Sequence, residues 1–154
     1  MVFIKEIVPR PAIALVARVV YNENYVSLPM RHHLEPGASG QPSSVEYGWE
    51  FNGRWNNVKA GLAGEPVEPS PASLDEFITE HYWGYAAQRD GGCVEYQVEH
   101  PRWRVWTASN ATFDGDLAEL YGAQFVSALS TPPTSAFVAE GSAVTVFKGQ
   151  RIET

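Results

Sequence analysis

The sequence predicts an α+β protein built on a strongly curved antiparallel sheet, a partial β-barrel, with one buried helix and two short helices. Two observations predict this class. Short runs of alternating apolar and polar residues are joined by hairpin signals such as Asn52-Gly53. Helical patterns are few, and they lack the strand–helix–strand rhythm of a parallel sheet. The 154 residues suit one domain, which we expect to span residues 1–154.

The N-terminal segment predicts a strand followed by an apolar helix. Val2–Val8 is β-branched and mostly apolar, which is typical of a strand. Pro11 then favours the start of a helix, and the pattern continues to about Tyr21. Arg18 is the only charge in this helix, so the sequence predicts that it is buried on most of its faces.

The next segment predicts three strands. Ser27–Leu34 alternates, and Pro29 places this strand at a sheet edge or at a bulge. Val45–Phe51 has the cleanest alternation in the chain, and Arg54–Lys59 is the expected return strand after the Asn-Gly turn.

The middle of the chain begins with a Pro- and Gly-rich stretch, Gly61–Pro71, which predicts a long loop. Ser73 and Glu76 then form the pattern of a capping box, and the short helix that they open ends near His81. The remaining strands are expected over Tyr82–Gln88, Cys93–Glu99, Trp103–Ser109, Phe137–Ala139 and Ala143–Phe147, and a short helix over Asp116–Tyr121.

The charge balance excludes several classes of partner. Eleven basic residues stand against 18 acidic ones, giving a formal net charge of −7. Because the bases are scattered, we expect neither nucleic acid nor an anionic membrane surface as a partner. The longest apolar run, Ala12–Ala17, is far short of the roughly 20 residues that a membrane span needs. No signal-peptide pattern is present, so we expect a cytoplasmic location.

Metal and cofactor sites are also disfavoured. Cys93 is the single cysteine, which excludes an internal disulfide and a thiolate cluster. His32 and His33 are adjacent, so on a strand they face opposite sides and do not share a metal. Phosphate-binding glycine loops are absent from the sequence. We therefore expect no metal and no cofactor.

Aromatic residues make up 12% of the chain, and such side chains often line apolar binding sites. Several of them bracket the apolar helix and the breaks between strands. A carboxylate after the helix and two histidines on mostly apolar strand faces add polar groups that are able to contact a ligand. The candidates for one ligand pocket are Tyr21, Glu23, Tyr25, Met30, His32, His100 and Trp103.

Three stretches together carry a family resemblance. They are the N-terminal strand and helix with their continuation to Met30, the motif Leu74–Tyr82 (LDEFITEHY), and Glu99–Trp103 (EHPRW). With these motifs the chain resembles the YqjF-like family of uncharacterised bacterial proteins. This resemblance implies a fold similar to acetoacetate decarboxylase, a curved antiparallel β-cone around a small-molecule cavity.

The chain departs from the family pattern in two ways. Typical members are longer, so this chain resembles the C-terminal portion of the family domain. The decarboxylase also uses a Schiff-base lysine activated by a neighbouring cation. Tyr25 and Val26 stand at the corresponding lysine positions, and the lysines that are present, Lys5, Lys59 and Lys148, include no adjacent pair. Lysine-dependent decarboxylation is therefore disfavoured.

Three functions stay open. The first is a small-molecule-binding domain of the decarboxylase-like fold that lacks the Schiff-base lysine. The second is a hydrolase or lyase-type enzyme that uses His and Glu acid–base chemistry on a small carbonyl compound or ester. The third is a truncated structural remnant that forms a homodimer through strand edges. The sequence assigns no catalytic residue and does not decide whether the chain is an enzyme.

Overall fold

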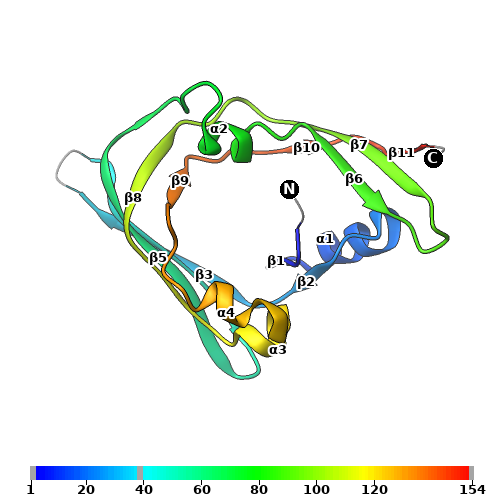
Figure 1. The fold of residues 1–154 in the computed structure, drawn as a ribbon, viewed down its shortest axis with the longest axis horizontal. Helices are drawn as coiled ribbons and strands as arrows, with labels where there is room; N and C mark the ends of the chain where they lie inside the picture. Colours follow the sequence, from blue (N-terminus) through cyan, green and yellow to red (C-terminus); the bar gives the residue numbers. More distant parts are fainter. Residues whose placement is uncertain (1–2, 38–39, 153–154) are drawn as a thin grey trace.

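A five-stranded antiparallel sheet, strongly curled into half a barrel, forms the larger part of the computed structural model, which describes residues 3–37 and 40–152 (Figure 1). Its strand order is β3-β4-β5-β8-β9, in which β3, β4 and β5 are joined as successive hairpins. The strands are β3 (Met30–Pro36), β4 (Pro42–Phe51), β5 (Arg54–Val67), β8 (Val105–Asp114) and β9 (Phe137–Ala139).

A second, smaller sheet extends from the half-barrel (Figure 1). Its central strand is β7 (Cys93–Glu99). The hairpin partner β6 (Trp83–Ala87) pairs along one side of β7. Along the other side lie β10 (Thr145–Val146) and then β11 (Gln150–Ile152).

The N-terminal unit is a parallel strand pair with a helical crossover. Strand β1 (Glu6–Val8) pairs in parallel with β2 (Tyr25–Ser27). Between them run the α-helix α1 (Pro11–Val16) and the π-helix η1 (Ala17–Tyr21). This unit corrects the expectation that strand–helix–strand connections are absent, because the helix crosses over between two short strands. Val2, the first residue of the strand expected from the sequence, lies outside the described residues.

Short helices cover part of the half-barrel. The predicted capping box is confirmed, because the Ser73 hydroxyl accepts a hydrogen bond from the backbone N–H of Glu76 at 3.1 Å. The Asp116 carboxylate caps the next helix in the same way, through the N–H of Glu119 at 3.3 Å. These helices are α2 (Leu74–Thr79), α3 (Leu117–Tyr121), the 3₁₀ turn η2 (Ala123–Phe125) and α4 (Val126–Leu129).

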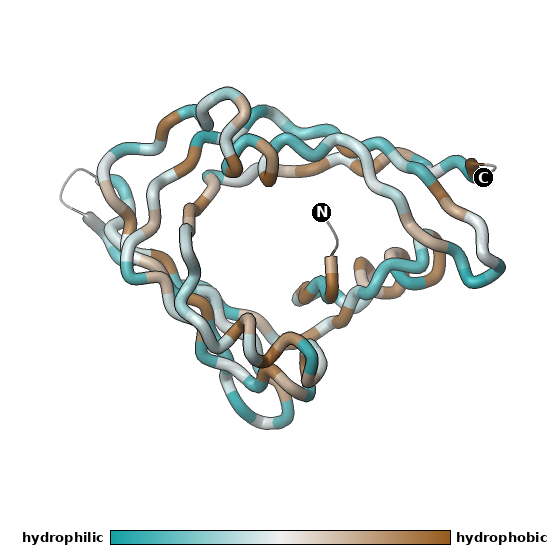
Figure 2. Tube along the Cα trace, viewed as in Figure 1, coloured by the Kyte–Doolittle hydropathy of each residue, from teal (hydrophilic) through white to brown (hydrophobic). Residues whose placement is uncertain are grey.

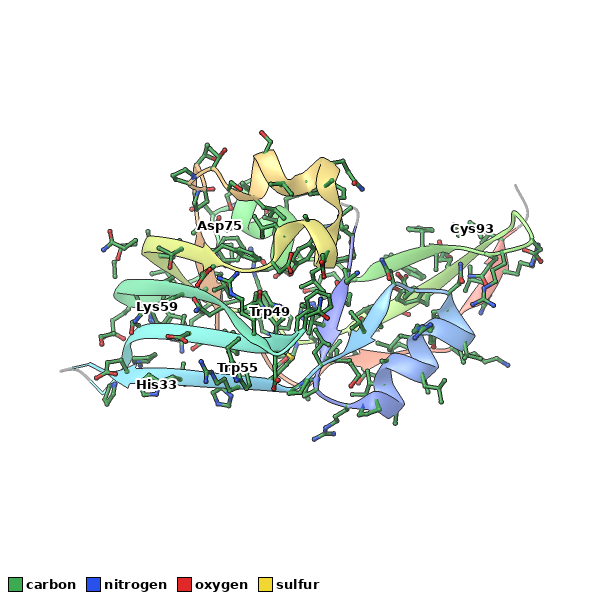
Figure 3. The ribbon with its side chains drawn as sticks, turned by 90° about the horizontal axis from the view of Figure 1, so that it is seen from below. His33, Trp49, Trp55, Lys59, Asp75 and Cys93 are labelled. Carbon is green, nitrogen blue, oxygen red and sulfur yellow. The ribbon has the colours of Figure 1, made fainter. Side chains whose placement is uncertain are left out.

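The main core lies between the half-barrel and helix α3. Trp49 is buried there and packs against Phe113, with ring centroids 5.6 Å apart. Leu120 on α3 is 2% exposed. Figure 3 shows Trp49 between the sheet and the yellow helices, whereas Cys93 lies at the far end of the second sheet.

A buried asparagine connects this core to the start of α3. Asn56 is fully buried, and its Nδ2 donates to the backbone oxygen of Arg54 at 3.0 Å. Its Oδ1 accepts from the backbone N–H of Asp116 at 2.6 Å. The amide therefore fixes α3 to the β4–β5 hairpin.

The predicted fold class is confirmed: the protein is α+β with a curled antiparallel half-barrel. The Asn52-Gly53 hairpin is also confirmed, with positive φ at both turn residues, 51° and 74°. The strand expected over Ser27–Leu34 is divided in the structure, because β2 ends at Ser27 and β3 begins at Met30, directly after Pro29. Strand β3 lies at the edge of its sheet, as the proline predicts.

The expectation of a long loop after Lys59 is wrong, because β5 continues to Val67. Beyond Gly61 the strand has lost its β4 neighbour and pairs only with β8. Proline and glycine are tolerated on such a one-sided strand, and the register shifts between Ala63 and Val67, next to Gly64 with φ 69°.

The prediction that the N-terminal helix is buried on most faces is also wrong. Ala14 is the one buried residue of α1, and η1 has none. Leu15 is 63% exposed and Val19 is 72% exposed. The helix rests on β1 and β2, and within the described chain no element covers its outer side (Figure 3).

Replacing Asn56 by alanine tests the connection to α3. We expect Asn56→Ala to lower the free energy of unfolding by roughly 2–4 kcal/mol, because a buried N–H and buried carbonyl groups lose their partner. The midpoint of urea unfolding measures this loss. The neighbouring Asn57→Ala is the matched control, and an equal loss in that variant contradicts the assigned role of Asn56.

Candidate functional site

The end of the N-terminal helix is attached to the second sheet through one asparagine. Asn22 adopts the left-handed conformation with φ 56°, which asparagine tolerates better than most residues. Its Nδ2 donates to the backbone oxygen of Ala87 at 2.7 Å, and its Oδ1 accepts from Arg89 Nε at 3.2 Å. Gln88 Nε2 donates to the backbone oxygen of Tyr21 at 3.2 Å. These bonds place the residues around Asn22 against the β6–β7 hairpin.

A pocket of about 420 Å³ lies between this helix and the second sheet. Its wall is mostly apolar and includes the π-helical turn, a rare element that often occurs at functional sites. Three phenol rings and one carboxylate supply the polar groups. The lining residues are Ala12, Ile13, Val16, Ala17, Tyr21, Glu23, Tyr25, Tyr96 and Val146.

The polar part of the pocket is organised around Tyr96. The Tyr96 hydroxyl donates a hydrogen bond to Glu23 Oε1 at 3.0 Å. The ring of Tyr21 packs edge-on against that of Tyr96, with centroids 5.1 Å apart. Gly84 lies opposite Tyr96 in the hairpin, and a Cβ atom there would be 2.1 Å from the Tyr96 ring. The glycine is therefore required for the tyrosine to reach Glu23.

A second carboxyl group, Glu6, lies beside this cluster. Glu6 is paired in register with Tyr25 across the parallel strands. Burial raises the pKa of Glu6, and the nearby Glu23 raises it further. Burial, followed by Glu6 and Glu23, raises the pKa of Tyr25, and burial and Glu23 raise the pKa of Tyr96 well above its usual range. Both phenols therefore keep their protons to a higher pH than a free tyrosine does, and Tyr96 donates its proton in a hydrogen bond to Glu23.

The structure brings three of the seven candidate residues together. Tyr21, Glu23 and Tyr25 line the pocket. Met30 and His32 lie on strand β3, where His32 is exposed and sits 6.0 Å from the Tyr47 ring.

The other two candidates lie in an aromatic stack. His100 is stacked between Tyr82 and Trp103, with centroid distances of 4.9 and 4.0 Å. Trp103 Nε1 donates to the Ser142 hydroxyl at 2.9 Å, so its polar atom is satisfied within the protein. Neither His100 nor Trp103 is among the residues that line the pocket.

Two polar groups were missed from the sequence: Tyr96 in the pocket wall and Glu6 beside it. Five apolar wall residues were also missed: Ala12, Ile13, Val16, Ala17 and Val146. A signal existed for Tyr96. The strands expected over Tyr82–Gln88 and Cys93–Glu99, paired as a hairpin, place Tyr96 opposite Gly84. An aromatic residue opposite a glycine indicates a ring that lies across the neighbouring strand. Glu6 and Val146 carried no such local signal, because each reaches the site through strand pairing with a distant segment.

A larger hollow of about 980 Å³ lies between β8 and the segment after α4. Its one charged lining residue, Asp114, is paired with Arg54 at 2.5 Å. In the described residues, no group of three or more His, Cys, Asp or Glu side chains is arranged to hold a metal ion. The pocket beside the helix is therefore the better candidate for a binding site.

Comparison with known protein families identifies this chain. The family DUF2071, described as an uncharacterized conserved protein, matches residues 1–143. The chain belongs to this family. No curated protein and no solved structure matches it. In the part of the chain that the structure describes, no helix has the length and apolar character to cross a membrane.

The raised pKa of Glu6 predicts that wild type and the variant Glu6→Gln differ in stability by an amount that depends on pH. The folded chain holds the Glu6 proton more tightly than the unfolded chain does. Stability therefore falls as pH rises from the ordinary pKa of 4.5 through the raised value, and the loss persists above it. Glu6→Gln removes this loss. We expect the variant to be more stable than wild type at neutral pH, with a difference that shrinks toward zero below about pH 4.

Urea unfolding of both proteins across this pH range measures the effect. Glu99→Gln, on an exposed position of β7, is the control for loss of one negative charge. If Glu99→Gln raises the free energy of unfolding at neutral pH by the same amount, the burial of Glu6 is not the cause of the gain.

Proposed function

We propose that this protein binds a small, largely apolar molecule that carries a cationic or hydrogen-bond-donating head group. The observation that carries the proposal is an apolar pocket with a single carboxylate, Glu23, in its wall. The volume of about 420 Å³ falls in the range of known small-molecule sites. The apolar side chains of Ile13 and Val16 favour the hydrocarbon part of such a ligand.

The charges around the pocket support a donor or cation over an anion. The lining contains no lysine, arginine or histidine. One oxygen of Glu23 accepts from Tyr96, and the second oxygen is the candidate acceptor for the ligand. An anion at this position would repel Glu23 by roughly 4 kcal/mol at 4 Å in a partly buried site, and Glu6 would add to the repulsion.

The acid–base alternative finds less support in the geometry. It needs a histidine and a carboxylate within hydrogen-bond reach in one cavity. His33 and Glu35 are 2.9 Å apart, but both are exposed on strand β3 and neither lines the pocket. We therefore propose binding and do not propose this catalysis.

Three eight-carbon probes with different head groups test the proposal by isothermal titration calorimetry. We expect octylammonium to bind most tightly, octanol less tightly, and octanoate at least about tenfold more weakly than octylammonium. Glu23→Gln should weaken octylammonium about tenfold or more and leave octanol nearly unchanged, since it removes the charge and keeps the shape.

Two further variants test whether the preference among head groups comes from Glu23. Tyr96→Phe removes the hydrogen bond to Glu23 and should weaken the preference among head groups while the apolar wall remains. Glu99→Gln removes the same charge from outside the pocket and should bind like wild type. Equal affinities for octylammonium and octanoate, or an equal loss in Glu99→Gln, would show that Glu23 does not select the head group.

A further inference from the structure

We propose that the outer helix face packs against the same face of a second copy of this chain, and that this contact covers the open side of the pocket. The covering of the pocket rests on the proposed ligand site, whereas the dimer contact does not. The outer helix face consists of Ile13, Leu15, Val16, Val19 and Val20, which are 47%, 63%, 52%, 72% and 55% exposed.

This face is apolar along the whole helix. Figure 2 shows α1 and η1 as largely hydrophobic, and Arg18 is the only charged residue in Pro11–Tyr21. A helix of a single folded chain usually carries a polar stripe toward water, and a helix that is apolar all round is covered on all sides. In the described chain, other elements pack against the helix and bury it only on the side of Ala14.

The solvent-accessible surface of the chain is larger than that of a typical folded monomer of the same mass. The chain exposes 10206 Å², whereas a folded monomer of 17.0 kDa exposes about 7,700 Å². The excess is of order 2,500 Å². Permanent homodimers bury roughly 1,000–2,500 Å² per subunit, so a second copy is able to cover the outer helix face and part of this excess. The rest of the excess includes exposed apolar residues away from the helix, such as Phe77 and Tyr85.

The distribution of charge favours a second copy at this face. The chain carries a net charge of −7, so two copies repel one another wherever acidic residues meet. The outer helix face contains no acidic residue, and in a two-fold contact it meets its own apolar surface. The free edge of the half-barrel is less suitable, because strand β3 presents exposed Arg31, His33 and Glu35, which are typical of an edge protected against pairing.

The same contact would change the pocket. Ile13 and Val16 belong both to the outer helix face and to the pocket lining, and Val146 beside them is 50% exposed. A second copy on this face would therefore remove water from the open side of the pocket. Burying that side strengthens the attraction between Glu23 and a cationic head group, because the local dielectric falls.

Sedimentation velocity of wild type and Val19→Glu tests the dimer. We expect wild type to sediment at twice the 17.0 kDa chain mass, and Val19→Glu to weaken association at least about 30-fold, because a charge is placed in the contact. Val19 is 72% exposed, so the folded chain should tolerate the substitution, which circular dichroism checks. Val19→Lys should give the same loss with the opposite charge.

Leu74→Glu is the matched control, since Leu74 is 57% exposed on helix α2, outside the outer helix face. It should stay dimeric. A wild-type chain that is monomeric at all concentrations overturns the proposal, as does a dimer that survives both substitutions of Val19. A monomer that instead co-sediments with phosphatidylglycerol vesicles overturns it in favour of a membrane surface.

Octylammonium binding to dimeric wild type and to monomeric Val19→Glu tests whether the second copy covers the pocket. We expect at least about fivefold tighter binding to the dimer, since only the dimer covers the pocket. Equal affinities overturn the covering of the pocket and leave the dimer supported. Absence of binding to both proteins overturns the proposed function, and with it the covering, while the sedimentation result for the dimer stands.

Discussion

The position of the pocket depends on the attachment of Asn22 to the β6–β7 hairpin. The helix rests on two short strands, so its own packing fixes its distance from the second sheet only weakly. The hydrogen bonds of Asn22 to Ala87 and Arg89 fix that distance. They also fix the two residues on either side, Tyr21 and Glu23, opposite Tyr96. The left-handed turn is thus the point at which a local backbone conformation determines the geometry of a site built from distant segments.

The chemistry of the pocket follows from placing acids beside an apolar wall. A buried carboxylate loses hydration and needs hydrogen-bond donors in return. Tyr96 supplies one such donor to Glu23, and the charge of Glu23, after burial, raises the pKa of that phenol. Glu6 adds a second acidic group at close range, which a chain selected only for stability has no reason to place there. Such local conflicts are characteristic of functional sites.

The sequence was informative wherever one short segment determined the structure. The hairpin at Asn52-Gly53 and the capping box at Ser73 depend on a few neighbouring residues, and both were predicted correctly. Tyr21, Glu23 and Tyr25 could be grouped in advance because they are close together in the sequence and follow the apolar helix.

Contributions from distant segments could not be predicted in the same way. Glu6 and Val146 reach the site through the pairing of β1 with β2 and of β10 with β7, which no local pattern specifies. His32 was grouped with the pocket because its strand face is mostly apolar, but β3 lies at the edge of the half-barrel and leaves that histidine exposed.

The apolar helix shows why periodicity alone misled. The pattern of Pro11–Tyr21 indicates a helix that needs cover, but it is the same whether the cover comes from the same chain or from another. In the described structure Leu15 and Val19 remain exposed, and in the dimer that we propose a second copy covers them. In that proposed dimer Ile13 and Val16 serve both the contact and the pocket, so association and ligand binding would be thermodynamically linked. If a second copy tightens the binding of a ligand, the ligand must tighten the dimer by the same factor.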